Sequence, residues 1–469
     1  MVSQMNNSEL KRDWLKKYSI VPDVLKSMSD INTAATAFNT NIDAVLKISG
    51  KGISKLINES GLSLVMLEHI RETRLNAPED VIKGIFKCFT KGIAEEWLTE
   101  DKAVFDWMVA NLGYDRLQMG GQGGIVANVL AVTGVKKVYA HTNSLPKLQA
   151  EQFLTLDNLV SFDSEGKEAS AYKIDRKEDI PLIHWIIEFD KGDYVEVDGQ
   201  KFVCPKANRF IATYDPLNLR LVKDEAFIKA TTGQAMDYVI LSGYHALTEK
   251  NEGLRLQRET LPIIQSWRKN GVVVHLEVAS TQDIAVRKAV IGTIAPEVDS
   301  IGVNERETID ILEALGKEDL AKACEKNTHS VNLFKAILEI KKHIKCGRVQ
   351  MHMFGLYITL QDKGFKISPE ANLRGMMMAA TLAAGKAGTG SLNDRNTLLW
   401  AQGQEVSDIG LEELRTLADY VGNEALLKTG LSEYDGFDVI AVPTILIEKP
   451  VTLVGMGDTI SSLSLLGAR

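Results

Sequence analysis

The chain has 469 residues, of which 45% are hydrophobic and 25% charged, and a formal net charge of −8. This composition is typical of a globular protein with a large core, and the dispersed lysines and arginines argue against nucleic acid as a partner. No stretch of about 18 uninterrupted apolar residues exists, so we expect no membrane span, and the N-terminus shows no apolar export segment. Four widely spaced cysteines form no CxxC pair, which predicts reduced thiols in the cytoplasm: Cys88, Cys204, Cys324 and Cys346.

The first informative stretch is FNTNIDAVL, which places Asn41 and Asp43 at the end of an early strand. Residues two apart in a strand share a face, so both polar side chains can point at one ligand. A hydroxyl-rich ligand such as a sugar needs paired donors and acceptors of this kind. The alternative is a solvated strand end or an Asx turn.

A mostly helical stretch at residues 60–110 is followed by GGQGGIVANVLA at residues 120–131. This is a glycine-rich turn leading into a helix. Its spacing does not match the G-x-G-x-x-G fingerprint of dinucleotide-binding proteins, which argues against an oxidoreductase. We predict a turn whose backbone packs against a small polar ligand, with Gln122 supplying hydrogen bonds. An ordinary helix start is the alternative.

The middle of the chain is rich in strands. LIHWIIEFD, DYVEV and KFVCP predict an antiparallel meander, with Asp198-Gly199 as a tight hairpin turn. A strand-rich insertion within an α/β chain is typical of a second lobe, and such a lobe can act as a lid.

From about residue 234, short apolar strands alternate with amphipathic helical stretches, beginning with AMDYVILSGY and ending with a helix near DTISSLSLL. This alternation predicts a mostly parallel sheet covered by helices on both faces. Within it, VVVHLEVAS and SIGVNERE supply Glu277, Asn304 and Glu307 at strand ends, where open α/β sheets bind ligands. Oxygen groups of this kind suit Mg²⁺ held through waters, although each could be an ordinary polar residue at a strand end.

The most informative stretch is VTLVGMGDTISSLSLL near the C-terminus. A strand ends, Gly455-Met456-Gly457 turns the chain, and Asp458 lies where a helix begins. Glycines let the backbone approach a ligand, and a helix N-terminus offers unpaired N–H groups that suit a phosphoryl group in transfer. The Asp458 carboxylate beside them can accept a proton from an attacking hydroxyl. The alternative is an aspartate that only caps the helix.

These segments, taken together, resemble the ribokinase-like superfamily and, within it, the archaeal ADP-dependent sugar kinases. The resemblance rests on an ordered set that spans residues 39 to 462: NTNID, MGGQGGIVANVL, IHWIIEF, NRFIATYD, VHLEVAS, the Asn304–Glu307 run, RVQMHM and VPTILIEKPVTLVGMGDTISS. It implies a large ribokinase-like domain with a mostly parallel sheet, and a small α/β lid domain. The family often has threonine where this chain has Leu453, whose side chain we expect to face the core.

The resemblance implies transfer of the β-phosphate of Mg·ADP to a sugar, with release of AMP. Asp458 would be the base, and Gly455, Met456, Gly457 and Arg209 would act on the phosphates. Glu277 and Glu307 would organise the metal. The nucleotide would lie near His352, Val442, Pro443 and Asn304. The sugar would lie among Asn41, Asp43, Gly121, Gln122 and His184.

Two residues bear on the choice of sugar. Glu95, in KGIAEEW, resembles the glutamate with which glucose-using members hold a hydroxyl, although Glu96 is an alternative alignment. Lys173 is a candidate cation for a substrate phosphate, with a solvated surface charge as the alternative. Together they favour fructose 6-phosphate, giving fructose 1,6-bisphosphate, with glucose as a second substrate. A glucokinase only, an ATP-dependent relative and a catalytically silent binding protein are the competing hypotheses.

We place the large domain at residues 1–45, 111–165 and 215–469, and the lid at residues 46–110 and 166–214. The expected partners are a sugar or sugar phosphate and ADP, with neither nucleic acid nor membrane. We expect a cytoplasmic monomer or small homo-oligomer.

Overall fold

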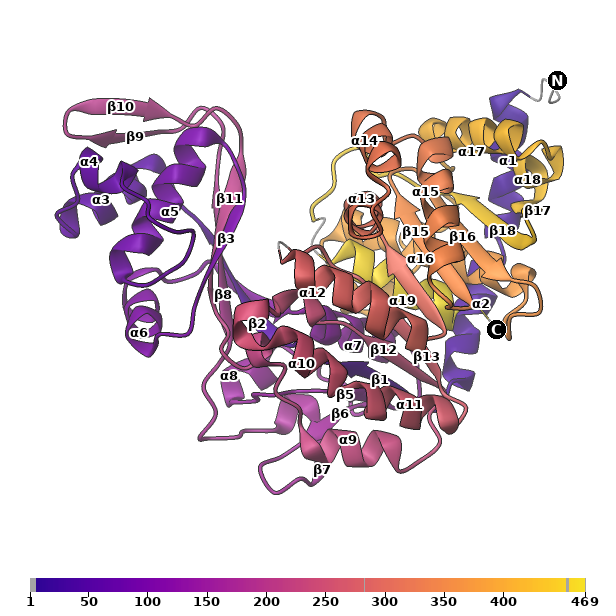
Figure 1. Ribbon diagram of the computed structural model, residues 1–469, viewed down its shortest axis with the longest axis horizontal. Coiled ribbons are helices and arrows are strands. Elements are labelled where there is room, and N and C mark those ends of the chain that lie inside the picture. The colour runs from indigo at the N-terminus through magenta and orange to yellow at the C-terminus, as the bar shows by residue number, and fades with distance from the viewer. Residues whose placement is uncertain (1–5, 282, 453–454, 469) are drawn as a thin grey trace.

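A computed structural model describes residues 6–281, 283–452 and 455–468, which form a large and a smaller lobe (Figure 1). In the large lobe, eleven strands of the described residues pair in the order β17-β18-β16-β15-β14-β13-β12-β1-β5-β6-β7. Their bounds in chain order are β1 Ala34–Ala37, β5 Val138–Ala140, β6 Leu159–Phe162, β7 Glu168–Ser170, β12 Tyr238–Leu241, β13 Val273–Glu277, β14 Ser300–Val303, β15 Arg348–Met353, β16 Leu356–Asp362, β17 Leu431–Tyr434 and β18 Phe437–Pro443.

Every pair from β6 across to β15 is parallel, and the antiparallel pairs lie at the two edges of the sheet. The predicted mostly parallel sheet is therefore confirmed. RVQMHMFGLYITL forms not one element but two antiparallel strands, β15 and β16, that turn at Phe354 and Gly355.

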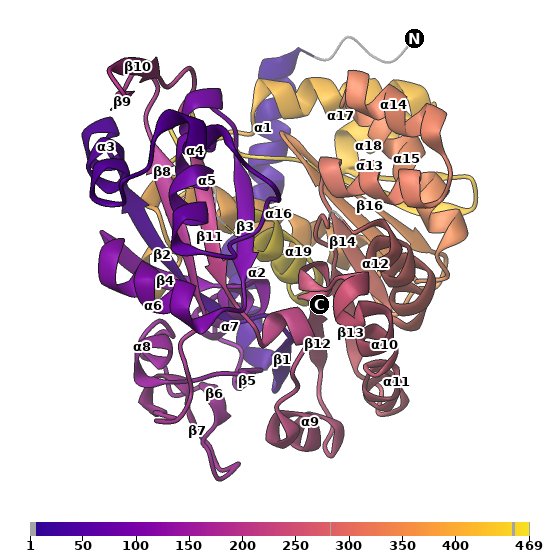
Figure 2. The ribbon, with the colours of Figure 1, turned by 60° about the vertical axis from the view of Figure 1, so that its left-hand side comes forward.

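Helices cover both faces of this sheet (Figures 1 and 2). One face is covered by α2 Val21–Ser27, α7 Gln122–Thr133, α16 Pro369–Thr389 and α19 Met456–Leu466. The other is covered by α9 Glu225–Thr232, α11 Leu261–Lys269, α13 Glu305–Ala314, α15 Ser330–His343 and α17 Asp408–Val421. The remaining helices of the lobe are α1 Asn7–Tyr18, α8 Lys147–Ala150, α10 Gly253–Arg258, α12 Ile284–Ala289, α14 Glu318–Lys326 and α18 Glu424–Thr429.

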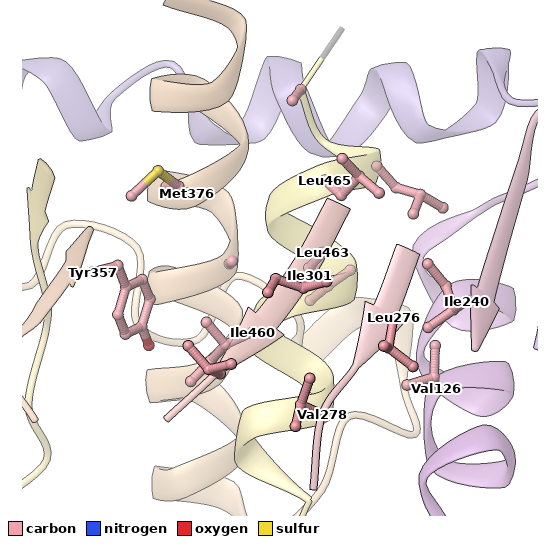
Figure 3. Close-up of a cluster of buried hydrophobic side chains, with 14 of the residues drawn as sticks. Val126, Ile240, Leu276, Val278, Ile301, Tyr357, Met376, Ile460, Leu463 and Leu465 are labelled. Atoms are coloured by element: carbon pink, nitrogen blue, oxygen red, sulfur yellow. The ribbon is translucent and has the colours of Figure 1, made fainter. Parts of the chain in front are cut away.

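The C-terminal helix α19 is fixed by the core of the large lobe. Ile460, Leu463 and Leu465 are buried on it, and Figure 3 shows them beside Leu276 of β13 and Ile301 of β14. The long helix α16 packs along α19 on the same side of the sheet. Because close-packed side chains hold both helices, the residues at the start of α19 have a defined position relative to the strand ends.

The smaller lobe has its own sheet, in the order β3-β11-β8-β2-β4, and a separate hairpin of β9 and β10. The strands are β2 Asn41–Lys47, β3 Glu95–Thr99, β4 Arg116–Gly120, β8 Ile183–Phe189, β9 Tyr194–Val197, β10 Gln200–Val203 and β11 Asn208–Tyr214. Four helices belong to it: α3 Gly50–Glu59, α4 Leu64–Glu68, α5 Pro78–Lys91 and α6 Lys102–Asn111. It has a separate hydrophobic core built on residues such as Trp97, Trp185 and Phe210.

Three local predictions for this lobe need correction. The tight turn at Asp198-Gly199 is confirmed, with φ of 50° and 74°, but β8 pairs with β2 and β11 rather than with β9, so no three-stranded meander forms. The stretch at residues 60–110 is mostly helical as predicted but also contains β3. Asn41 does not end the early strand β1: it begins β2.

Strand pairing differs from the proposed domain limits at three places. Most of β2 and all of β4 lie in the smaller sheet, although residues 1–45 and 111–165 were assigned to the large domain. β7 lies in the larger sheet, although residues 166–214 were assigned to the lid. The division into two domains stays a prediction. All four cysteines are buried and unpaired. Across the described ranges, we find no helix with the length and apolar character needed to span a membrane.

Candidate active site

A tight turn introduces the last helix of the chain. Gly455 adopts the left-handed conformation, with φ of 61°, and α19 begins at the next residue, where the sequence predicts a helix. A Cβ atom at Gly455 would lie 2.9 Å from Ile125 Cδ1, so the position requires glycine. The first amides of a helix have no intrahelical acceptor, and this turn therefore presents N–H groups at the positive end of the helix dipole. Leu453 lies outside the described residues.

Asp458 lies in the first turn of α19 but does not cap the helix. The N-cap position is Gly455, and no side chain makes a capping bond there. Instead, Gln122 Nε2 donates a hydrogen bond to Asp458 Oδ1 at 2.7 Å. Burial raises the pKa of the Asp458 carboxyl, while the Gln122 bond and the nearby charges of Lys386 and His245 oppose that rise. The carboxylate is thus held in one orientation and kept able to exchange a proton.

The glycine-rich turn before α7 packs against polar side chains of β2. Asn41 Nδ2 donates to Asp43 Oδ1 at 3.0 Å, so the two residues do share a face. A Cβ atom at Gly120 would lie 2.2 Å from Asp43 Oδ1, and Gly121 has φ of 71° with only 2.7 Å from its Cβ position to the Asn39 carbonyl oxygen. The backbone therefore comes as close to these side chains as glycine permits.

Several buried polar atoms at this place have no hydrogen-bond partner among the described residues. They are Asn39 Oδ1, Asn41 Oδ1, Gln122 Oε1 and His245 Nδ1. Buried polar atoms are nearly always paired in folded proteins, so a cluster of unpaired ones is a candidate site for a polar ligand. The clustered acceptors suit the hydroxyl groups of a sugar.

His184 lies on the same face of the smaller sheet as Asp43, because the two residues are register partners on β8 and β2. His184 Nε2 is 3.0 Å from Asp215 Oδ2, and Nδ1 is 3.9 Å from Glu96 Oε1. Burial alone would lower the pKa of His184, but the bond to Asp215 and the charges of Asp215, Glu96 and Asp43 outweigh it and raise the pKa to about 9. The imidazolium form is therefore favoured at neutral pH.

His184, Asp215 and Glu96 line a cleft of about 630 Å³, whose walls also include Asn39, Thr213 and His245. We call it the interlobe cleft, because its walls come from the smaller sheet and from the strand ends of the large lobe. His245, which follows β12, lines the end of the cleft that is nearer to α19. It is close enough to Asp458 for the charge of that carboxylate to act on the His245 ring. The sugar-side predictions Asn41, Asp43, Gly121, Gln122 and His184 are thus brought together with Asp458.

The two adjacent glutamates of β3 behave differently. Glu96 accepts a hydrogen bond from Thr213 Oγ1 at 2.7 Å and approaches His184. Glu95 also borders the cleft, but its carboxylate is held by Lys87 Nζ at 2.7 Å and Trp97 Nε1 at 2.9 Å. Neighbouring residues of a strand point to opposite faces, so only one of them joins His184. The alternative alignment, Glu96, is the one that the geometry favours.

Lys173 and Arg209 are not gathered with these residues. Lys173 Nζ pairs with Asp157 Oδ1 at 2.9 Å, both side chains are exposed, and neither borders the interlobe cleft. The prediction that Lys173 holds a substrate phosphate therefore has no support from its position. Arg209 is exposed on β11 and lies on the same face of the strand as Thr213, which borders the cleft. The two residues are four positions apart, or roughly 13 Å along the strand.

A second cleft, of about 410 Å³, lies at the other side of the start of α19. We call it the apolar cleft, because its walls include Met353, Tyr357, Ile445, Ile447, Met456 and Ile460. His352 borders it, and burial lowers the pKa of His352 to about 4, so the ring is neutral. Such a cleft, ending at unpaired helix amides, suits a flat aromatic base with a phosphate tail.

Val442 and Pro443 do not line the apolar cleft. Val442 is fully buried in β18, and the Pro443 carbonyl oxygen accepts a hydrogen bond from the Tyr18 hydroxyl at 2.7 Å. The residues that follow them, 444–448, form the wall instead. Val442 and Pro443 directly precede this wall, and their place near the nucleotide stays a prediction.

The acidic residues expected at the metal lie behind the C-terminal turn. Burial raises the pKa of Glu277 well above its ordinary range, as do the charges of Asp458 and Glu307. Burial also raises the pKa of Glu307 to about 8. Asn304 and Glu307 form a capping box at the start of α13, in which the Asn304 amide donates to Glu307 Oε2 at 2.8 Å.

Three desolvated carboxyl groups that repel one another fit a nearby cation. No group of three or more His, Cys, Asp or Glu side chains arranged as direct ligands occurs among the described residues. Glu277 and Glu307 therefore fit Mg²⁺ held through waters, as this ion prefers, rather than a closed protein cage.

Sequence reasoning missed three residues of this site. Lys386 on α16 contacts the C-terminal turn, His245 faces Asp458, and Asp215 holds His184. A signal existed for Lys386, because it is the lone charge in the apolar stretch GMMMAATLAAGKA. His245 follows AMDYVILSGY at the carboxyl end of a parallel strand, which is also where ligands bind.

Comparison with known proteins gives a consistent result. A family profile described as "ADP-specific Phosphofructokinase/Glucokinase conserved region" matches residues 32–467. An ADP-specific phosphofructokinase from Pyrococcus abyssi is 32% identical over 91% of this chain and 95% of its own length. An ADP-dependent glucose/glucosamine kinase from the same organism is 31% identical over 94% of this chain and 95% of its own length.

Solved structures agree in fold. A structure described as an ADP-dependent kinase in complex with fructose-6-phosphate and ADPbetaS has a TM-score of 0.82 and 28% identity, covering 99% of this chain and 98% of that one. The last common ancestor of ADP-dependent phosphofructokinases from Methanosarcinales has a TM-score of 0.84 and 28% identity, covering 99% of both chains. The ribokinase-like fold and the resemblance read from the sequence are confirmed. This chain belongs to the family of ADP-specific phosphofructokinases and glucokinases.

Proposed function

We propose that this protein transfers the β-phosphate of ADP to fructose 6-phosphate, giving fructose 1,6-bisphosphate and AMP, and that it also accepts glucose. One observation carries the proposal. The Asp458 carboxylate, fixed by Gln122 at 2.7 Å, stands at a glycine turn between a polar cleft with unpaired acceptors and an apolar cleft. A base placed between a sugar site and a nucleotide site is what phosphoryl transfer to a hydroxyl requires.

In the proposed reaction, Asp458 accepts the proton of the attacking sugar hydroxyl as the O–P bond forms. The bond between the β-phosphorus and the bridging oxygen breaks, and the leaving electrons remain on AMP. At the C-terminal turn lie the backbone amides of Met456 and Gly457 and the neutral imidazole of His352. None of these groups is negatively charged, so none repels the phosphoryl group. Preorganised N–H donors stabilise the charge that develops in such a step.

Mg²⁺ held near Glu277 and Glu307 would supply positive charge that offsets the repulsion among phosphates and carboxylates. The protein holds these two carboxyl groups in place next to the C-terminal turn. The Glu307 side chain is anchored by the Asn304 amide, and Glu277 Oε2 lies 3.3 Å from His275 Nε2. These bonds fix where each carboxyl points.

The smaller lobe would close over the sugar and carry Glu96, His184 and Arg209 with it. His184 and Glu96 are already mutually oriented by Asp215 and Thr213. Closure would bring the exposed Arg209 guanidinium toward the nucleotide phosphates and would exclude water, which otherwise competes as the phosphoryl acceptor. Arg209 stays a proposed contact of the closed state.

The choice of fructose 6-phosphate is supported by two comparisons. Phosphofructokinases are among the most similar relatives, and a similar solved structure is described with fructose-6-phosphate. Glucose is supported by the ADP-dependent glucose/glucosamine kinase relative and by Glu96, whose carboxylate faces the cleft. Lys173 pairs with Asp157 and does not border the interlobe cleft, so its position adds no support to its proposed role at the sugar phosphate.

The test is a matrix of initial rates, with ADP or ATP as donor and fructose 6-phosphate or glucose as acceptor, each over a concentration series with Mg²⁺. We expect AMP and fructose 1,6-bisphosphate in equal amounts with ADP, and slower turnover of glucose. A preference for ATP, or sugar turnover confined to glucose, would contradict the donor or the acceptor assignment respectively.

A further inference from the structure

A buried lysine contacts the C-terminal turn. Lys386 Nζ, on α16, donates to the Gly455 carbonyl oxygen at 3.0 Å and lies 3.2 Å from Thr459 Oγ1. Thr459 Oγ1 donates to the same carbonyl at 2.7 Å. Together with the Thr459 backbone N–H at 3.3 Å, one carbonyl oxygen therefore receives three donors, and they come from two residues that are at least 90% buried.

Lys386 lacks the direct ion pair that a structural lysine usually has, and the charge of Asp458 acts on it only from beyond ion-pair distance. Among the described residues, no carboxylate lies within ion-pair distance of Lys386 Nζ, which is 8% exposed. By contrast, the other buried lysine, Lys341, is 5% exposed and pairs with Asp362 at 2.5 Å. An unpaired buried ammonium group is unfavourable for stability, so stability is a poor explanation for its presence.

The peptide geometry links this contact to the reacting phosphate. In a trans peptide the carbonyl and the following N–H point in opposite directions within one plane. The Gly455 carbonyl is directed at Lys386, so the Met456 N–H of the same peptide is directed away from it. Gly455 is in the left-handed region, where glycine has several accessible conformations. The bond from the Thr459 backbone N–H to this carbonyl is long, at 3.3 Å, so the shorter Lys386 contact adds to what holds the plane.

The helix that carries Lys386 also borders the nucleotide side of the site. Ala383, Ala384 and Ala387 of α16 line the apolar cleft, together with Met456. A single rigid helix thus contacts both the turn and the wall against which the nucleotide would bind. Small side chains at these positions bring the α16 backbone close to the cleft.

We propose that Lys386 is a positioning residue, which fixes the Gly455 carbonyl and thereby aims the amides of the C-terminal turn at the transferred phosphoryl group. This inference rests on the proposed kinase function and adds a residue to it. Lys386 does not touch the sugar or the nucleotide in this account. Its loss should therefore lower the rate of the chemical step and leave ground-state binding of the sugar nearly unchanged.

The test compares Lys386→Met, which keeps the length and loses the donor, with Lys386→Arg and with Lys341→Met as the matched control. Misplaced catalytic groups cost about 10²-fold in rate, so we expect kcat of Lys386→Met to fall about that much, with the sugar KM within about threefold of wild type. Lys386→Arg should recover part of kcat, and Lys341→Met should change thermal stability but not kcat. A Lys386→Met enzyme with kcat within about threefold of wild type would overturn the proposal.

A second pair of variants tests the same carbonyl if Lys386→Met does not fold. Thr459→Val removes the hydroxyl donor and keeps the shape, whereas Thr459→Ser keeps the donor. We expect kcat to fall in the valine variant and to stay near wild type in the serine variant; equal kcat values for the two would count against the proposal.

A crystal structure of Lys386→Met, or of Thr459→Val in its place, separates this inference from the proposed function. A reoriented Gly455 carbonyl supports the positioning role even if the wild type transfers no phosphate from ADP. An unchanged carbonyl contradicts that role even if the wild type is a fully active ADP-dependent kinase.

Discussion

Gln122 and Asp458, which are 336 positions apart in the chain, meet through a single hydrogen bond of 2.7 Å between Gln122 Nε2 and Asp458 Oδ1. The bond joins the start of α7 to the start of α19, and so joins the two glycine-rich turns of the sequence. Its effect on Asp458 is electrostatic as well as geometric, because a hydrogen bond to a carboxylate favours the ionised form.

Replacing Gln122 with alanine should therefore raise the pKa of Asp458. A base must be ionised to accept a proton, so the acid limb of the kcat profile should move to higher pH. The measurement is kcat against pH for wild type and Gln122→Ala, with Gln402→Ala as a control, since Gln402 donates only to the Tyr18 carbonyl. An acid limb that does not move would show that the bond has no influence on the base.

The pKa of His184, raised to about 9 from an ordinary value of 6.5, predicts a pH dependence of stability. A group whose pKa is raised in the folded state contributes stability that is fully present below the unfolded pKa and is lost as pH rises through the folded pKa. Wild type should therefore exceed His184→Gln in thermal stability at pH 6, and the difference should shrink by pH 10. The check is a pair of melting curves across this range; a constant difference would contradict it.

Substitution of the two glutamates of β3 should affect different properties, sugar binding for Glu96 and stability for Glu95. Glu96→Ala should raise KM for glucose by about tenfold, because its carboxylate faces the cleft beside His184. Glu95→Ala should change KM little and lower the melting temperature instead, since it loses contacts with Lys87 and Trp97. Sugar titrations and melting curves on both variants decide the matter, and a larger KM effect at Glu95 would restore the original assignment.

Gly120→Ala should damage the sugar site although it adds only one methyl group. The new Cβ atom would lie 2.2 Å from Asp43 Oδ1 and 2.3 Å from Asn41 Nδ2, so at least one of these side chains must move. Overpacking of this kind costs about 1–3 kcal/mol, which corresponds to about tenfold or more in sugar KM. Gly292→Ala is the matched control, because its Cβ atom would meet nothing within 4 Å. Equal sugar KM values for the two variants would mean that the close contact of Gly120 with Asn41 and Asp43 does not matter for sugar binding.

Much of the fold and part of the site could be predicted from the sequence. Parallel strands can be predicted because they appear in the sequence as continuous apolar runs. The GMGD string predicts a helix start because the pattern of glycines followed by an acidic residue is local in the sequence. Asn41 and Asp43 could be paired because their relation depends only on strand periodicity.

What could not be predicted depends on contacts between distant segments. The choice between Glu95 and Glu96 depends on which face β3 turns to β8 and β11 in the folded sheet, and no local pattern fixes it. Lys173 could serve a ligand or the surface by its sequence alone, and its pairing with Asp157 depends on how two distant segments meet. Val442 and Pro443 lie inside β18, whose pairing with β16 extends to Pro443, and the wall of the apolar cleft begins at the next residue.

The central claim is that Asp458 is the base of an ADP-dependent sugar kinase. The most direct measurement is kcat of Asp458→Asn with ADP and fructose 6-phosphate, together with the sugar dissociation constant by calorimetry. We predict that kcat falls by about 10²–10⁴-fold while the dissociation constant stays near that of wild type. Near-normal turnover in this variant would contradict the claim.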